Sequence, residues 1–127
     1  MNGTYFQTVG ASPGVDVLSV HDYYGSAAMG GDQWSGLALR FAQAKALAKP
    51  IITGEVGIIA GNGQPGCESL QQRASDMTAK MTAQFAAGGS AFLVWDWILD
   101  PIGPCNYNTG PTDSSLLSAV ASMPAGG

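Results

Sequence analysis

The sequence predicts an α/β fold made of three parallel β-α units in a single domain that covers residues 1–127. Three short runs rich in β-branched and aromatic residues, at 15–20, 50–59 and 91–99, predict the strands. None of the runs alternates between apolar and polar residues, which is typical of strands buried on both faces. Helical patterns follow the runs, and this alternation implies a parallel sheet with right-handed crossovers.

The first helix is expected between Asp32 and Lys49. Asp32 can serve as its N-cap, because a short acidic side chain accepts the free amides of a first helical turn. Apolar residues then recur at steps of three and four along one face, at Trp34, Leu37, Phe41, Ala44 and Ala48. Pro50 ends the helix, since proline has no amide donor and disfavours helix in the residue before it. We interpret Trp34 as a helix-packing or loop-contact residue.

Two further helices follow the second and third strands. Ser69 with Gln72 three residues later is a capping-box signature, and the glycines at 88–89 supply a stop. The apolar stripe expected on this helix consists of Leu70, Ala74, Met77, Met81 and Phe85. A last helix is expected over residues 113–123, before Pro124.

Composition excludes several classes of function. Apolar residues make up 46% of the chain and charged residues 11%, which is typical of a globular protein. A net charge of −4 disfavours binding to nucleic acid or to an anionic membrane. No apolar run is long enough to span a bilayer, and no signal peptide is visible at the start. His21 is the single histidine and the two cysteines, Cys67 and Cys105, are far apart, so we expect no metal site. A disulfide and two free thiols both remain open.

Polar and aromatic residues gather where the three predicted strands end. His21 and Tyr23 follow the first strand, Glu55 lies in the second, and Trp95 and Asp96 lie in the third. In parallel α/β folds, chemistry takes place beyond the carboxyl ends of the strands. The sequence therefore predicts a functional site built from these three ends.

These same stretches resemble a known family. "VDVLSVHDYYG", "KPIITGEVG" and "GSAFLVWDW" look like the sixth, seventh and eighth strands of a clan A (β/α)8-barrel glycoside hydrolase, the group with the family five cellulases, endoglucanases and mannanases. "GDQWSGLALRFAQAKALAK" is similar to the helix between strands six and seven. The resemblance spans roughly residues 5–123 and implies a partial (half) TIM barrel, since whole barrels run to about 250 residues.

The resemblance implies a retaining glycoside hydrolase that acts on β-linked glucans or aryl β-glycosides without a cofactor, and it favours a secreted protein. Glu55 would be the nucleophile, Tyr23 would donate a hydrogen bond to it, and His21 would line the same subsite. Trp95 would stack on the sugar ring, since an aromatic platform suits the apolar C–H face of a sugar. Without the resemblance, we would interpret His21 as a structural residue. Glu55 could be an ion-paired structural residue, but no lysine or arginine is close to it in the sequence, and with the resemblance we favour the functional role.

The general acid is not evident. The family uses a glutamate that follows an asparagine, whereas the only glutamates here, Glu55 and Glu68, follow other residues. A retaining mechanism needs two carboxyl groups about 5–5.5 Å apart. Asp96 and Asp22 are candidates that the resemblance does not support, and both can equally cap loops; Asp100 and Glu68 are the others. The alternative function is a catalytically incomplete half barrel that binds sugar or assembles with itself.

A half barrel leaves two sheet edges unpaired and its inner face uncovered. Open edges pair readily with other chains, and exposed apolar patches mark association surfaces. We therefore expect a homo-oligomer formed through these edges, which could bring a carboxylate of one copy to Glu55 of another. Refolding into a small open α/β sandwich is the alternative.

Overall fold

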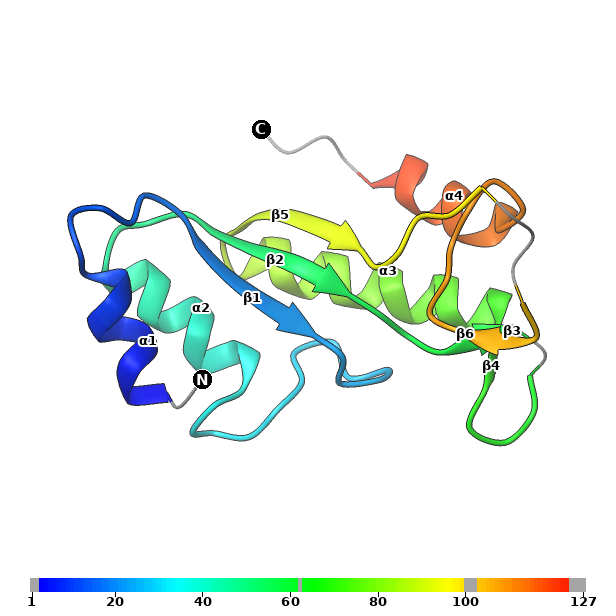
Figure 1. Ribbon diagram of the computed structural model, residues 1–127, viewed down its shortest axis with the longest axis horizontal. Coiled ribbons are helices and arrows are strands. Elements are labelled where there is room, and N and C mark those ends of the chain that lie inside the picture. The colour runs from blue at the N-terminus through cyan, green and yellow to red at the C-terminus, as the bar shows by residue number, and fades with distance from the viewer. Residues whose placement is uncertain (1–2, 62, 100–102, 124–127) are drawn as a thin grey trace.

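A three-stranded parallel sheet forms the centre of the molecule (Figure 1). The computed structural model describes three stretches of the chain: residues 3–61, 63–99 and 103–123. The sheet has the order β1-β2-β5 and consists of β1 (Leu18–Asp22), β2 (Ile51–Val56) and β5 (Gly89–Val94). The predicted parallel α/β arrangement is confirmed, but the third strand ends five residues earlier than residue 99. Beyond Val94 the chain turns to meet a later loop, where the Ile98 amide donates to the Thr109 carbonyl at 2.9 Å.

Four helices lie in the described stretches: α1 (Gly3–Gly10), α2 (Leu37–Ala46), α3 (Leu70–Ala86) and α4 (Ser114–Ser122). The N-cap predicted at Ser69 is confirmed, because the Ser69 hydroxyl accepts the Gln72 amide at 3.1 Å. The Gln72 side chain donates to Asp76 at 3.1 Å instead of closing a full capping box. Asp113 caps α4 in the same way through the Leu116 amide. The sequence analysis did not predict α1. None of these helices is long and apolar enough to cross a membrane.

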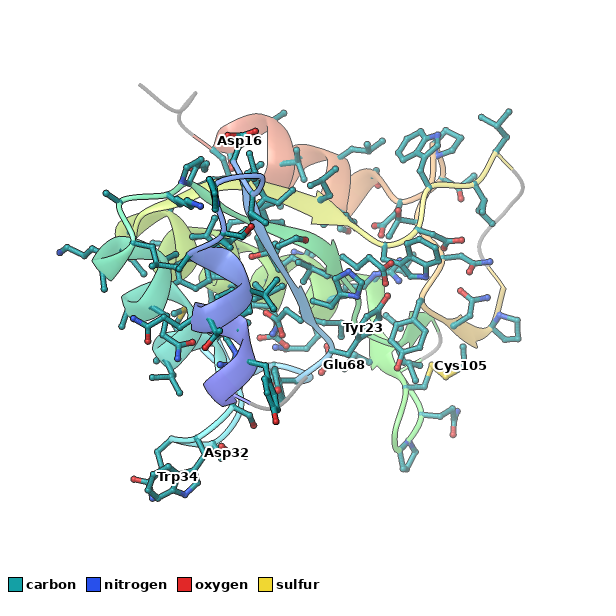
Figure 2. All side chains as sticks on the ribbon, turned by 60° about the vertical axis from the view of Figure 1, so that its left-hand side comes forward. Asp16, Tyr23, Asp32, Trp34, Glu68 and Cys105 are labelled. Atoms are coloured by element: carbon teal, nitrogen blue, oxygen red, sulfur yellow. A yellow bond between two sulfur atoms is a disulfide. The ribbon has the colours of Figure 1, made fainter. Side chains whose placement is uncertain are left out.

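The start of α2 differs from the prediction. The Asp32 carboxylate accepts the amides of Trp34 and Ser35 at 2.6 and 2.7 Å, which closes a local turn instead of the first turn of the helix. These bonds lower the pKa of Asp32, the Trp34 amide contributing most. The helix then begins at Leu37. Trp34 is 74% exposed on a segment that projects from the molecule (Figure 2), so its predicted packing role is wrong.

The helices cover one face of the sheet. Leu37, Phe41 and Ala44 of α2 pack on Leu18 and Ile51. A second cluster, further toward the carboxyl ends of the strands, joins the sheet to α3 and α4 and consists of Val56, Ile58, Met77, Met81 and Leu116. In Figure 1, α3 runs behind the sheet.

The apolar stripe predicted on α3 is buried at Ala74, Met77 and Met81, but the buried side of the helix is also partly polar. Arg73, Lys80 and Gln84 are fully buried or nearly so, whereas Phe85 is exposed. Lys80 Nζ donates to both carboxylate oxygens of Asp22, at 2.8 and 2.9 Å, and Gln84 Nε2 donates to the same carboxylate at 2.7 Å. These residues stay buried because each finds a partner of complementary charge or hydrogen-bonding type.

A second, small sheet covers the carboxyl ends of the main strands. Its order is β4-β3-β6, with β3 (Ala60–Gly61), β4 (Glu68–Ser69) and β6 (Cys105–Asn106). The Cys67–Cys105 disulfide joins the loop after β2 to the loop after β5, which resolves the alternative left open by the sequence.

Candidate active site

Glu55 projects from an irregularity at the carboxyl end of β2. Val20 pairs with Thr53 but His21 pairs with Glu55, so Gly54 is an extra residue relative to β1. A Cβ atom on Gly54 would lie 2.6 Å from Ser19 Oγ, so only glycine fits there without displacement. Such bulges re-aim the side chains beside them. Here the bulge turns Glu55 toward the residues that follow β1.

Two predicted site residues contact the Glu55 carboxylate. The Tyr23 hydroxyl donates a hydrogen bond to Glu55 Oε2 at 2.7 Å, and His21 Nδ1 lies 3.4 Å from the same oxygen. The Glu55 side chain keeps 29% of its surface exposed and that of His21 keeps 54%. The carboxylate is thus fixed by a donor yet open to a ligand, which is the state that a nucleophilic carboxylate requires.

Tyr23 is itself held in place from both sides. Its ring meets Tyr107 edge to face, with 5.3 Å between the ring centroids. Gly57 makes this contact possible, because a Cβ there would come within 2.5 Å of Tyr23 and 2.8 Å of Tyr107. The preceding residue, Asp22, is anchored by Lys80, and its carbonyl accepts the Gly57 amide at 3.1 Å. The loop that carries Tyr23 is therefore tied to both β2 and α3.

The environment of Tyr23 predicts an unusual titration. Burial, followed by the hydrogen bond to Glu55, raises the pKa of Tyr23 from 10.0 to about 12. The raised pKa favours the fold below pH 10, and this contribution is lost as the pH rises through about 12. In a pH titration, the difference in tyrosinate absorbance between the wild type and Tyr23→Phe should have its midpoint near pH 12. The Glu55→Gln substitution should lower the pH of that midpoint. A midpoint near 10.0 in the wild type would contradict the Tyr23–Glu55 contact.

Trp95 and Asp96 follow β5 directly. The Trp95 amide donates to the Val56 carbonyl at 2.8 Å, so its backbone lies beside the residue after Glu55, and its side chain is 45% exposed. The Trp95–Asp96 peptide is cis. Asp96 Oδ1 is buried and has no hydrogen-bonding partner among the described residues. Asp96 also contributes to the raised pKa of Tyr23, which places its charge near the site.

The other acid candidates lie elsewhere. Asp22 is fully buried, and Lys80 and Gln84 bind its carboxylate against α3, so the structure does not bring it to Glu55. Glu68 lies in β4, next to Asp76 of α3. Asp100 falls outside the described residues. In the described stretches, no three His, Cys, Asp or Glu side chains gather in a group that could hold a metal.

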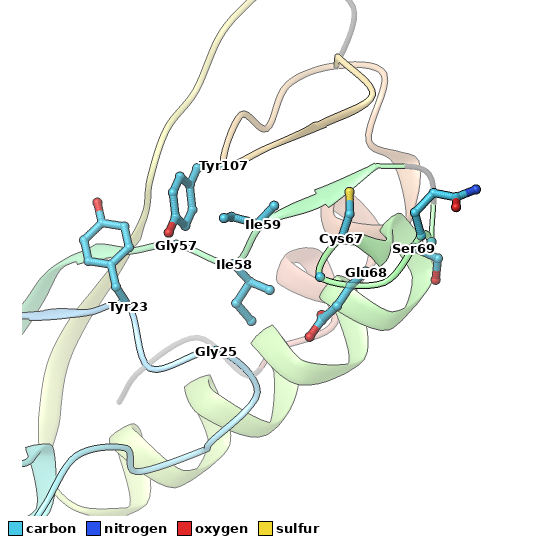
Figure 3. Close-up of a pocket in the computed structure, with 12 residues that line it drawn as sticks. Tyr23, Gly25, Gly57, Ile58, Ile59, Cys67, Glu68, Ser69 and Tyr107 are labelled. Carbon is cyan, nitrogen blue, oxygen red and sulfur yellow. The ribbon is translucent and has the colours of Figure 1, made fainter.

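A pocket of about 520 Å³, which Tyr23 helps to line, adjoins this site (Figure 3). Tyr107, Gln64 and Glu68 line it together with Tyr23. Sequence reasoning missed Tyr107 and Gln64. The one signal that could have found them is the cysteine pair, because a Cys67–Cys105 bond brings the two loops together.

The fold is similar to part of a mannan-degrading enzyme. No family model matches the sequence, and no curated relative matches it. The endo-1,4-beta-D-mannanase from Thermotoga petrophila RKU-1, solved with maltose and glycerol, matches 91% of this chain with a TM-score of 0.64 and 16% identity. A second structure of the endo-beta-1,4-mannanase from Thermotoga petrophila gives a TM-score of 0.62, also at 16% identity and over 91% of this chain. The chain spans only 35% and 27% of those two chains. The likeness shows the fold alone, and the parallel sheet is consistent with part of a TIM-like barrel.

Proposed function

We propose that this chain carries the nucleophile half of a retaining glycoside hydrolase active site, with Glu55 as the nucleophile. The observation that carries the proposal is the 2.7 Å hydrogen bond from Tyr23 to a partly open Glu55 carboxylate at the end of a parallel strand. The fold similarity to two mannanases supports it. In barrel enzymes of this kind, catalytic side chains lie at the carboxyl ends of the strands.

The chemistry would run in two steps. Glu55 attacks the anomeric carbon and forms a glycosyl ester, while the aglycone leaves and takes up a proton. Water then attacks the same carbon, releases the sugar and restores the carboxylate. Tyr23 would hold the attacking oxygen in place and Trp95 would support the sugar ring. For substrate we favour β-linked glucans or mannans, the latter because both similar structures are mannanases.

The proton donor is the open part of this proposal. Asp96 is one candidate, because its buried Oδ1 has no hydrogen-bonding partner among the described residues and its charge contributes to the raised pKa of Tyr23. A carboxylate from a second copy is the other. β1 and β5 each pair with β2 alone in the described sheet, so both outer edges are open to another chain.

Activated aryl β-glycosides test the proposed reaction directly. A good leaving group such as dinitrophenolate departs without a proton, so we expect turnover of dinitrophenyl β-glucoside or β-mannoside. A poor leaving group such as phenolate needs acid assistance. If the acid is weak or absent, kcat/KM across a series of aryl glycosides should therefore fall steeply as the pKa of the leaving group rises. A kcat/KM that does not depend on the leaving group would indicate an efficient general acid. The absence of turnover of any aryl glycoside at high enzyme concentration would overturn the proposal.

The open edges favour a second candidate function, a sugar-binding half barrel that assembles with itself. Sedimentation equilibrium should reveal a dimer or larger species whose population grows with protein concentration. Lysine substitutions at Ser19 in β1 and Leu93 in β5, both exposed, should shift that equilibrium toward the monomer. A concentration-independent monomer with a cooperative unfolding transition would rule out assembly through these edges. Sugar affinity without turnover would favour this second function over catalysis.

A further inference from the structure

The pocket beside Tyr23 has the composition of a carbohydrate site. Its volume of about 520 Å³ falls within the range of small-ligand pockets, about 300–1,000 Å³. Tyr23 and Gly25 lie on one side and Glu68 on the other, with Ile58 between them (Figure 3). Two tyrosine rings supply apolar faces with polar edges, which suits a ring that carries both C–H and hydroxyl groups.

Glycines give a ligand access to the main chain in this pocket. Gly25, Gly57, Gly63 and Gly66 all line it, and a Cβ added at Gly25 or Gly66 would meet no atom within 4 Å. A ligand can therefore approach the backbone closely there. The disulfide holds the Cys67 side of the pocket against the loop that carries Tyr107, so the two walls are fixed relative to each other.

Glu68 brings a carboxyl group to the wall of the pocket. Its Oε2 and Oδ2 of Asp76 are both buried, and neither accepts a hydrogen bond from any other group in the described part of the chain. Burial, the charge of Asp76 and a side-chain hydrogen bond between the two carboxyls raise the pKa of Glu68 above its usual range. A proton held between the two carboxyls thus accounts for their buried oxygens. A ligand hydroxyl can bond to the part of the Glu68 carboxyl that lines the pocket.

We propose that this pocket is a second sugar subsite, in which Glu68 accepts a hydroxyl hydrogen bond and Tyr107 contacts the ring of a β-linked unit. Tyr23 forms the wall shared with Glu55, so one oligosaccharide could occupy both places. The inference deepens the proposed function and rests on it only for the choice of ligand. The preferred ligand is an oligosaccharide, because Glu68 lines this pocket and Glu55 does not.

The test is a ¹⁵N NMR titration of the wild-type chain with β-1,4 tetrasaccharides of glucose and of mannose whose linking oxygens are replaced by sulfur, which prevents hydrolysis. The amides of Gly25, Gly57, Gly63 and Gly66 should shift and saturate with at least one tetrasaccharide. The corresponding methyl monosaccharide should leave Gly63 and Gly66 unmoved. Glu68→Gln should weaken tetrasaccharide binding about tenfold, because a neutral amide oxygen accepts a weaker hydrogen bond than a carboxylate does.

The control is Asp16→Asn, which removes an exposed carboxylate from the loop before β1 and should bind like the wild type. If Glu68→Gln does not fold, Gln64→Ala on the exposed side of the pocket takes its place. Glycine amides that stay unmoved at saturating tetrasaccharide, or unchanged affinity in the pocket variant, would overturn the subsite. If the glycine amide signals shift but no aryl glycoside is hydrolysed, the subsite proposal stands and the proposed reaction is wrong.

Discussion

Replacing Glu55 with glutamine should lower kcat/KM for a dinitrophenyl β-glycoside by about 10,000-fold or more, as expected when a nucleophile is removed. The amide can still accept the Tyr23 hydroxyl hydrogen bond, so the site keeps its shape, but a neutral amide oxygen is a poor nucleophile toward the anomeric carbon. Initial rates measured with matched concentrations of wild type and variant give the ratio directly.

Two other variants show whether the loss is specific to Glu55. Tyr23→Phe removes one hydrogen bond to the carboxylate and should cost only about 10- to 100-fold, in proportion to a charge-assisted bond. Asp96→Asn should have little effect with the activated leaving group but a larger one with phenyl glycoside if Asp96 is the acid. Retention of wild-type activity in Glu55→Gln would remove Glu55 from the mechanism.

Lys80→Met should destabilise the fold by about 3–5 kcal/mol, because it leaves a buried carboxylate without its counter-ion. Lys80 and Asp22 are both fully buried, and Lys80 Nζ also donates to the Ala27 carbonyl at 2.8 Å. The variant therefore weakens the link between α3 and the loop that carries Tyr23, leaving only the hydrogen bond from Gln84 to Asp22 among the described residues. Urea unfolding followed by circular dichroism gives the free energy of unfolding.

Two comparisons isolate this ion pair. Lys45→Met, at an exposed position in the last turn of α2, should change the stability by about 0.5 kcal/mol or less. Adding Asp22→Asn to Lys80→Met should recover part of the loss, since the unpaired charge is then gone and Gln84 can still donate to residue 22. Equal stabilities for Lys80→Met and Lys45→Met would contradict the buried pair.

The main features of the site could be predicted because they follow strand ends. Glu55 stands at the end of an apolar run and His21 and Tyr23 follow another, so the parallel order alone places them at one edge of the sheet. The structure brings these three side chains together. The bulge at Gly54 could not be predicted from the sequence. A register shift depends on how two strands pair, and the paired residues here lie 33 or 34 positions apart in the sequence.

The polar contacts of α3 could not be predicted from the sequence for a related reason. A periodicity argument counts only apolar residues, so it leaves Lys80 and Gln84 out of the buried face although both are buried. The partner of Lys80 lies 58 residues away in the sequence, and nothing in the helix points to it. The prediction for Trp34 was wrong in the opposite sense. This large apolar residue has helical spacing in the sequence, but it lies in an exposed turn that the Asp32 carboxylate closes.

Trapping the covalent intermediate tests the central claim most directly. A dinitrophenyl 2-deoxy-2-fluoro-β-glycoside should transfer its sugar to the enzyme and leave it there. Fluorine slows both the formation and the hydrolysis of the ester, whereas the activated leaving group restores the rate of formation alone, so the ester accumulates. Mass spectrometry of the digested protein should then find the fluorosugar on the peptide that contains Glu55, and the adduct should be absent from Glu55→Gln. A sugar adduct on any other carboxylate would contradict the assignment of Glu55 as the nucleophile.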